Sequence, residues 1–133
     1  MTAKARNKAI LVAVVLTAAA VIVSLLPMIA STSTDPIRDV RIITRDMTFY
    51  LEGSDVPNPT LTFRAGERVR ILLKNEDDGM DHDFSVPAWQ VKTKLLTGRG
   101  EDTLVLQVPN KTGTEAYTCT PHAEIMRGTI RIE

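Results

Sequence analysis

The chain has 133 residues, 44% hydrophobic and 24% charged, which fits a membrane or export segment followed by one compact domain and excludes two domains. Residues 1–30 hold three of the 16 basic side chains and none of the 16 acidic ones, so the rest of the chain has 13 basic and 16 acidic side chains. This mildly acidic remainder lacks the basic stripe of a nucleic-acid-binding protein. The single cysteine excludes an internal disulfide, so a core or a metal ion must hold the domain together.

The first segment is Ala9–Leu26, a run of 18 uncharged and mostly apolar residues that follows three cations. It is near the lower limit for a membrane-spanning helix and long for the apolar region of a cleaved signal. We therefore expect an N-terminal transmembrane or signal helix within residues 1–30. An uncleaved anchor is favoured over a cleaved signal because Met28 suits a cleavage site poorly. A buried core helix is the alternative.

The basic flank of this segment is expected to stay in the cytoplasm, which places the rest of the chain on the extracytoplasmic side. The expected organisation is a membrane anchor or signal (1–30), a polar linker (31–39) and a folded domain (40–133). The domain would be anchored to the membrane, or secreted to the periplasm if the first segment is cleaved.

After Asp39 the hydrophobic pattern has a period of two residues, which is typical of half-buried strands. The alternation is strongest in three segments: 67–74, 102–109 and 128–133. Weaker candidates are 40–45, 47–51, 60–63, 83–86 and 115–119. Gly, Pro, Asn and Asp separate these segments, and no helical stripe follows residue 35. The pattern predicts an all-β domain, a sandwich or small barrel of seven to eight short strands.

The closing segment gathers three soft or borderline donors, Cys119, His122 and Met126, within eight residues. Period two puts Cys119 on the same face as Tyr117, so its thiol should point into the sandwich near one end. Pro121 ends the strand because it cannot donate to a ladder, and His122 then lies in a loop. A loop pinned between two strands returns on itself, so its donors can converge on one point.

A thiolate, an imidazole and a thioether together suit copper better than magnesium or calcium. Two histidines, one cysteine and a weak axial methionine form the trigonal site that serves electron transfer in blue copper proteins. The second histidine of the chain, His82, lies 37 residues before Cys119, and a sandwich can bring strand ends together. The chain therefore contains every ligand that one copper ion of this kind needs: His82, Cys119, His122 and Met126.

These features make the domain similar to the cupredoxins of the plastocyanin and amicyanin type. The likeness rests on the loop Cys-x₂-His-x₃-Met, on Tyr117 two residues before the cysteine, on the strand GTIRIE and on the stretch ILLKNEDDGMDHDFSV. It implies a Greek-key β-sandwich over residues 40–133 with one type 1 copper, cycling between Cu(I) and Cu(II) and held by the four ligands, Met126 axially. The His–Met spacing differs from both types, and Asp83 replaces a common Asn. An inward carboxylate there should favour Cu(II).

The leading hypothesis is a membrane-tethered, extracytoplasmic carrier of single electrons, monomeric and without enzymatic activity. Its partners would be redox proteins of an electron-transport chain, docking transiently on an apolar rim of Pro121, Ala123 and Ile125 around His122. The alternative is a copper-binding or copper-delivery protein with the same ligands and no carrier role. Cys119 as an enzymatic nucleophile is disfavoured, because Pro121 and the short spacing make a poor Cys–His dyad.

Each candidate residue also has an ordinary structural interpretation. Cys119 can be a small buried hydrophobic residue, His82 a solvated turn residue, and Met126 part of the core. Met80 is a rival sulfur donor, and Asn75 can bond to the cysteine loop or cap a turn. The acids within residues 76–83 can form a solvated face or a docking patch for a basic partner.

Overall fold

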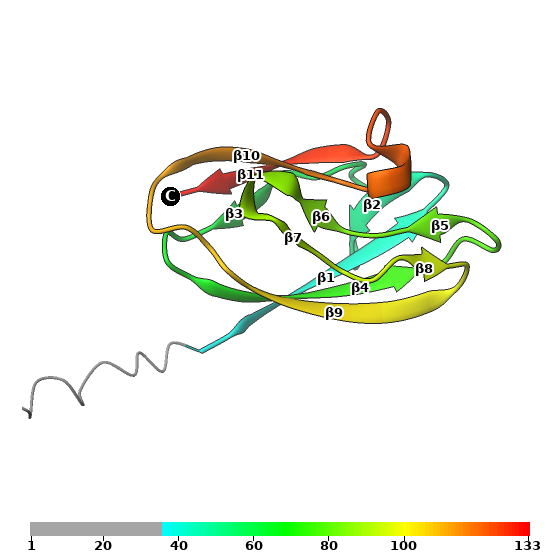
Figure 1. Ribbon diagram of the computed structural model, residues 1–133, viewed down its shortest axis with the longest axis horizontal. Coiled ribbons are helices and arrows are strands. Elements are labelled where there is room, and N and C mark those ends of the chain that lie inside the picture. The colour runs from blue at the N-terminus through cyan, green and yellow to red at the C-terminus, as the bar shows by residue number, and fades with distance from the viewer. Residues whose placement is uncertain (1–35) are drawn as a thin grey trace, which may run out of the picture. The chain divides into compact units, whose positions relative to one another are not determined.

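The structure, a computed structural model, describes residues 36–133 (Figure 1). Its first sheet has four strands, in the spatial order β2 (Thr48–Leu51), β1 (Arg38–Arg45), β4 (Arg68–Asn75) and β9 (Gly100–Gln107). The second has five, in the order β3 (Leu61–Phe63), β11 (Arg127–Ile132), β10 (Gly113–Thr118), β6 (Ser85–Val86) and β7 (Val91–Lys92). A short ladder joins β5 (Asp81–His82) to β8 (Leu96–Thr97), and two 3₁₀ turns, η2 (Pro87–Trp89) and η3 (Thr120–His122), complete the elements.

The prediction of an all-β domain is confirmed, but residues 36–133 contain eleven strands in place of the expected seven to eight. Seven of them are three residues or longer, and each overlaps a segment predicted from the alternation. The other four, β5 to β8, have two residues each and lie within residues 81–97. Strands this short are defined by backbone pairing, and two residues are too few to show a hydrophobic period.

The predicted membrane or signal segment, residues 1–30, lies outside the described residues, and the domain boundaries at residues 30 and 39 remain predictions. From residue 36 onward, no helix has the length and apolar character that a membrane crossing requires.

The core lies between the inner faces of the two sheets, as the alternation predicts. Val69, Ile71 and Leu73 of β4 are at most 1% exposed. They face a core that Ile130 and Ile132 of β11 also enter. The intervening residues, Arg70, Leu72 and Arg131, are more exposed. Burying apolar side chains of this size stabilises a fold by about 1.5–3 kcal/mol each. This alternation therefore fixes which face of each strand turns inward.

Three aromatic side chains close the core beneath the loop that follows β10. The Tyr117 ring stacks on Phe84 with ring centroids 5.2 Å apart and meets Phe49 edge-on at 5.3 Å. All three rings are 0% exposed, and the Tyr117 hydroxyl donates a 2.6 Å hydrogen bond to the Pro59 carbonyl oxygen. The strand leading to Cys119 is therefore fixed in position.

The sheets bring distant chain segments to one end of the sandwich (Figure 1). Parallel β1 and β4 end in register at Thr44 and Asn75, and the chain then turns into β5. Antiparallel β10 and β11 are paired out to Thr118 and Arg127, so the loop between them emerges at one end of that ladder. β5 contacts η3 there, which brings His82 to the loop of Cys119.

Candidate metal centre

The loop after β10 is closed by its own backbone. Cys119 and Met126 face each other at its base, because the Cys119 N–H donates to the Met126 carbonyl over 3.1 Å. Inside the loop, the His122 N–H donates to the Cys119 carbonyl over 3.1 Å, and the Met126 N–H donates to the His122 carbonyl over 2.8 Å. Pro121 stands in the first turn of η3, where a missing N–H costs nothing. The expectation that this loop returns on itself is confirmed.

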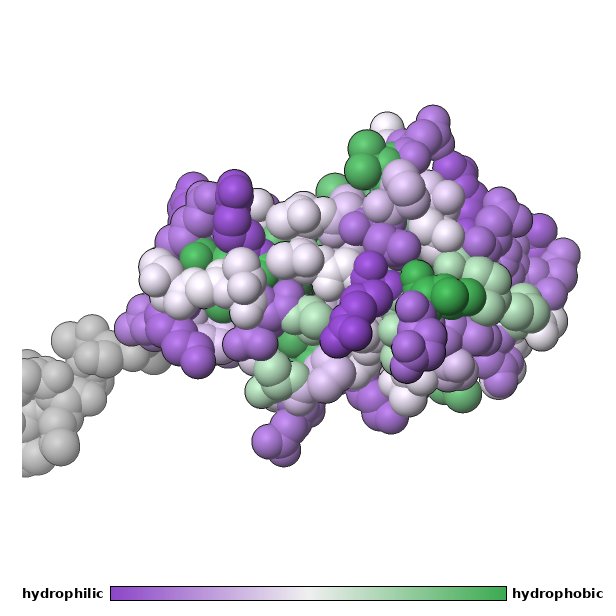
Figure 2. All heavy atoms as spheres, turned by 90° about the horizontal axis from the view of Figure 1, so that it is seen from above, coloured by the Kyte–Doolittle hydropathy of each residue, from purple (hydrophilic) through white to green (hydrophobic). Residues whose placement is uncertain are grey.

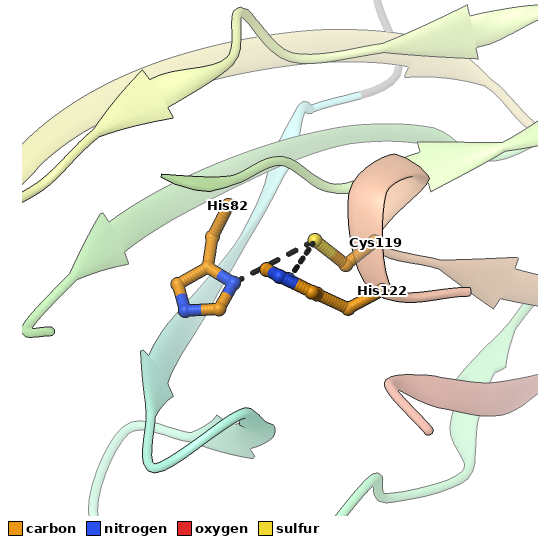
Figure 3. A group of neighbouring side chains, drawn as sticks. All are labelled: His82, Cys119 and His122. Atoms are coloured by element: carbon orange, nitrogen blue, oxygen red, sulfur yellow. Dashed lines mark hydrogen bonds between the residues drawn. The ribbon is translucent and has the colours of Figure 1, made fainter. Parts of the chain in front are cut away.

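Two histidine rings face the same sulfur atom (Figure 3). The Nδ1 atoms of His82 and His122 each lie 3.6 Å from Cys119 Sγ, and the candidate donor atoms of the three residues lie within 4.8 Å of one another. The prediction that His82 reaches the loop 37 residues later is therefore confirmed. A thiol has a single proton, so it can donate to only one of these two nitrogens.

The two sulfur–nitrogen distances fit ligands around one metal ion. With a metal–sulfur bond of about 2.3 Å and metal–nitrogen bonds of about 2.0–2.1 Å, as for zinc, ligands at trigonal to tetrahedral angles stand about 3.6–3.8 Å apart. Both Nδ1–Sγ distances fall at the lower edge of this range. One thiol and two imidazoles are also donors that copper accepts. The residues present therefore fit a bound copper ion.

Burial differs between the two rings. His82 is 0% exposed, so its interpretation as a solvated turn residue is wrong, whereas His122 is partly exposed. Cys119 is also 0% exposed, and like Tyr117 it faces the core, as the period of two predicts. Of the three donors, the His122 ring alone connects the centre to the surface.

The two candidate sulfur donors, Met126 and Met80, also differ in burial. Met126 is 0% exposed in the closed loop, while the rival donor Met80 is 36% exposed. Burial beside the cysteine is compatible with an axial thioether and equally with core packing. The roles of Met126 and of the other three residues as ligands therefore remain predictions.

Asp83 joins the strand of the first histidine to the cysteine loop. Its buried carboxylate accepts a 2.6 Å hydrogen bond from the Thr120 N–H, next to Cys119. Burial raises the pKa of the Cys119 thiol, and the negative charge of the nearby Asp83 carboxylate raises it further. The N–H groups of Asp83 and His122 favour the thiolate and partly oppose this rise. The metal-free thiol is therefore protonated at neutral pH, and metal binding must release that proton.

Asp77 holds the far side of the His82 ring, a role that the sequence did not indicate. Its Oδ2 lies 2.8 Å from His82 Nε2. Burial alone would raise the pKa of Asp77, but the N–H groups of Asp46 and Met47 and the His82 ring hold it below its ordinary value of 3.8. No local pattern marks this residue, because Asp77 stands in a run of acids most of which face solvent.

Asn75 fixes the loop that carries Asp77. Its amide donates to the carbonyl oxygens of Met80 and Gly98, over 2.9 and 2.8 Å. Its Oδ1 accepts from the Thr44 hydroxyl at 3.1 Å and from the Asp77 N–H at 3.0 Å. Of the two roles considered for Asn75, the capping of a turn is confirmed.

The family model of copper binding proteins of the plastocyanin/azurin family matches residues 58–133, more than half of the chain. The chain belongs to this family and is a cupredoxin. The family match and the three converging donors support one copper ion as the cofactor of this cupredoxin. A comparison with curated proteins found no match.

Solved structures share the fold at low sequence identity. Auracyanin A, a "blue" copper protein from Chloroflexus aurantiacus, is 18% identical with a TM-score of 0.58, over 74% of this chain and 100% of that one. Auracyanin from Roseiflexus castenholzii is 16% identical with a TM-score of 0.58, over 72% and 97% of the two chains. Rusticyanin from Thiobacillus ferrooxidans is 22% identical with a TM-score of 0.50, over 75% and 79%.

Proposed function

We propose that this cupredoxin carries single electrons between redox proteins through one type 1 copper site. The observation that carries the proposal is the convergence of three donor atoms from two distant segments, two of them on fully buried residues and one on a ring that reaches the surface. Copper bound here supplies a one-electron change between Cu(I) and Cu(II). The ligands would be His82, Cys119 and His122, with Met126 axial.

The surrounding residues hold the donors in place. The closed loop fixes Cys119 relative to His122, and the hydrogen bond between Asp83 and the Thr120 N–H ties this loop to the segment of His82. A centre held in this way changes its geometry little between two oxidation states, which suits transfer of an electron. Asp83 lies close enough to the sulfur to raise the pKa of its thiol, and its negative charge favours Cu(II) and lowers the potential.

The partner would dock where His122 reaches the surface. Pro121 is exposed, Ala123 is half-buried, and Ile125 is 58% exposed, so they offer an apolar rim close to His122 in the chain. On the face shown in Figure 2, hydrophobic side chains form small separate patches on a largely polar surface. A small rim suits the weak and brief encounters of redox proteins. We expect the carrier to be monomeric.

The proposal includes a place outside the cytoplasm. The support is the uncharged run Ala9–Leu26 behind three basic residues, which favours an anchor with the following domain on the extracytoplasmic side. Fractionation of cells expressing the full chain tests this: the protein should remain with membranes in high salt, and deletion of residues 1–30 should release it. Release of the full chain by salt alone would contradict the anchor.

Two further activities are less well supported by the same geometry. A copper-delivery protein passes its ion through ligand exchange with a partner, but here two of the three converging donors are fully buried. An enzyme with Cys119 as nucleophile needs an accessible thiolate, whereas this thiol is 0% exposed and its pKa is raised. We therefore propose a carrier that is not an enzyme.

The deciding experiment is voltammetry of the copper-loaded full chain, combined with an assay of Cu(I) transfer to a competing chelator. A carrier gives a reversible one-electron wave and retains its copper in both oxidation states. Loss of copper on reduction, or rapid transfer of Cu(I) without a reversible wave, would refute the carrier function and favour copper delivery.

A further inference from the structure

We propose that Asp77 is a positioning residue of the copper centre, which fixes the tautomer of His82 before the metal binds and strengthens this ring as a ligand of Cu(II). The proposal about the bound metal rests on the proposed function. The proposal about the tautomer does not, because it concerns the metal-free protein.

The two ring nitrogens of His82 have different partners. Nε2 lies 2.8 Å from Asp77 Oδ2, and Nδ1 lies 3.6 Å from Cys119 Sγ. An ionised carboxylate can only accept hydrogen bonds, so the ring proton must stand on Nε2 for this contact to form. Nδ1 then presents its lone pair toward the point that Cys119 and His122 also face. Because His82 is 0% exposed, Asp77 and not solvent is the partner of Nε2.

Asp77 is itself held from two strands of the first sheet. Its Oδ1 accepts a 2.9 Å hydrogen bond from the Asp46 N–H in the turn between β1 and β2. Its own N–H donates to Asn75 at the end of β4, over 3.0 Å. Asp46 and Met47 have φ angles of 50° and 57°, a left-handed conformation that side chains other than glycine seldom adopt. This strained turn aims its N–H groups at the carboxylate, which therefore has little freedom to move.

The neighbouring acids are not placed in this way. Asp78 has a side chain 81% exposed and pairs with Arg99 over 2.7 Å. Asp81 precedes His82 directly and is exposed. Asp81 therefore provides a matched control: it has the same charge, is adjacent to the same histidine in the chain, and makes no hydrogen bond to the ring.

A carboxylate behind a histidine ligand makes the ring more basic, and loss of such a partner typically costs about 10- to 100-fold in metal affinity. We expect Asp77→Asn to lose Cu(II) affinity by a factor of this size. Its Cu(I) affinity should change less, because Cu(I) needs less negative charge from its ligands. Each tenfold loss of Cu(II) affinity relative to Cu(I) corresponds to a rise of about 59 mV in the potential. In Asp81→Asn, the loss of charge alone should have a smaller effect.

The test has two arms, both on the full chain. In the first, ¹⁵N NMR of the histidine rings in the copper-free protein should show His82 with a protonated Nε2 and an unprotonated Nδ1. Asp77→Asn should give a mixture of tautomers, whereas Asp81→Asn and the carboxylate-retaining Asp77→Glu should keep the original one. A wild-type His82 with the proton on Nδ1 would overturn the proposal without any variant.

In the second arm, Cu(II) affinity and potential are measured for the two asparagine variants. Asp77→Asn should lose about 10- to 100-fold in Cu(II) affinity and shift the potential upward by more than Asp81→Asn does. Equal changes in both variants would mean that only the charge matters, and would overturn the role of the hydrogen bond. A wild-type protein without a reversible wave would instead refute the carrier function, and the NMR arm would still decide the tautomer.

Discussion

Gly128 is predicted to be required for the full stability of the β10–β11 pair, which carries the loop of Cys119 and His122. It lies opposite Tyr117 in the register of β10 and β11, and a Cβ atom at Gly128 would overlap the ring and hydroxyl of Tyr117. The ring cannot retreat, because it is stacked on Phe84, meets Phe49 edge-on, and donates a hydrogen bond to Pro59. Gly128→Ala must therefore displace Tyr117 or separate the strands.

The cost has two parts. Overpacking a closed core typically costs about 1–3 kcal/mol, and the loss of one buried hydrogen bond adds about 1 kcal/mol. We therefore expect Gly128→Ala to lower the free energy of unfolding by about 2–4 kcal/mol. Urea unfolding of the copper-free protein, followed by the fluorescence of the single tryptophan, Trp89, measures this difference.

Gly100→Ala in β9 is the matched control. A Cβ atom there would meet only Leu96 Cδ2, at 3.6 Å, and the glycine has no positive φ to lose. Relief of glycine's backbone entropy should leave this variant as stable as wild type or up to about 1 kcal/mol more stable. A free energy of unfolding for Gly128→Ala within about 0.5 kcal/mol of wild type, the usual range for a surface substitution, would show that Tyr117 does not need the glycine.

Three other predictions concern the loops and the titratable groups. Asn75→Ala should cost about 2–4 kcal/mol in urea unfolding, because it removes the hydrogen-bond partner of the buried Thr44 hydroxyl and of the Gly98 carbonyl; a loss below about 1 kcal/mol would contradict its role in holding the loop. The copper-free protein should lose stability as the pH rises above about 9, since burial raises the pKa of Cys119 above 9.0 and that of Tyr117 above 10.0, and the unfolded chain then releases these protons first. Unfolding measured from pH 7 to 11 checks the sign, and a flat profile would refute it. Met126→Leu, which nearly conserves volume, should keep the copper and shift its potential if the thioether is axial; an unchanged potential would leave Met126 as core packing.

The sheets were predictable because each long strand places one row of side chains in a single core. The alternation of Val69, Ile71 and Leu73 is a direct consequence of that burial. Strands β5, β7 and β8 could not be read in the same way, because their two-residue pairing depends on how the loop from residue 81 to 97 folds back.

The donor residues of the site could be predicted from the sequence, but the residue that holds His82 in place could not. Cys119 and His122 stand in one short loop, so their spacing is visible in the sequence, and His82 followed from the need for a second imidazole. Asp77 could not be identified among its acidic neighbours. Its contact with His82 depends on the turn of Asp46 and on Asn75, which are brought together only by the pairing of β1, β2 and β4.

The most direct test of the account is metal analysis of the purified full chain together with its visible absorption spectrum. We expect one copper per chain and an intense visible band from charge transfer between a cysteine thiolate and Cu(II), absent in Cys119→Ser. A wild-type chain that binds no copper, or a band that survives in Cys119→Ser, would contradict the central claim.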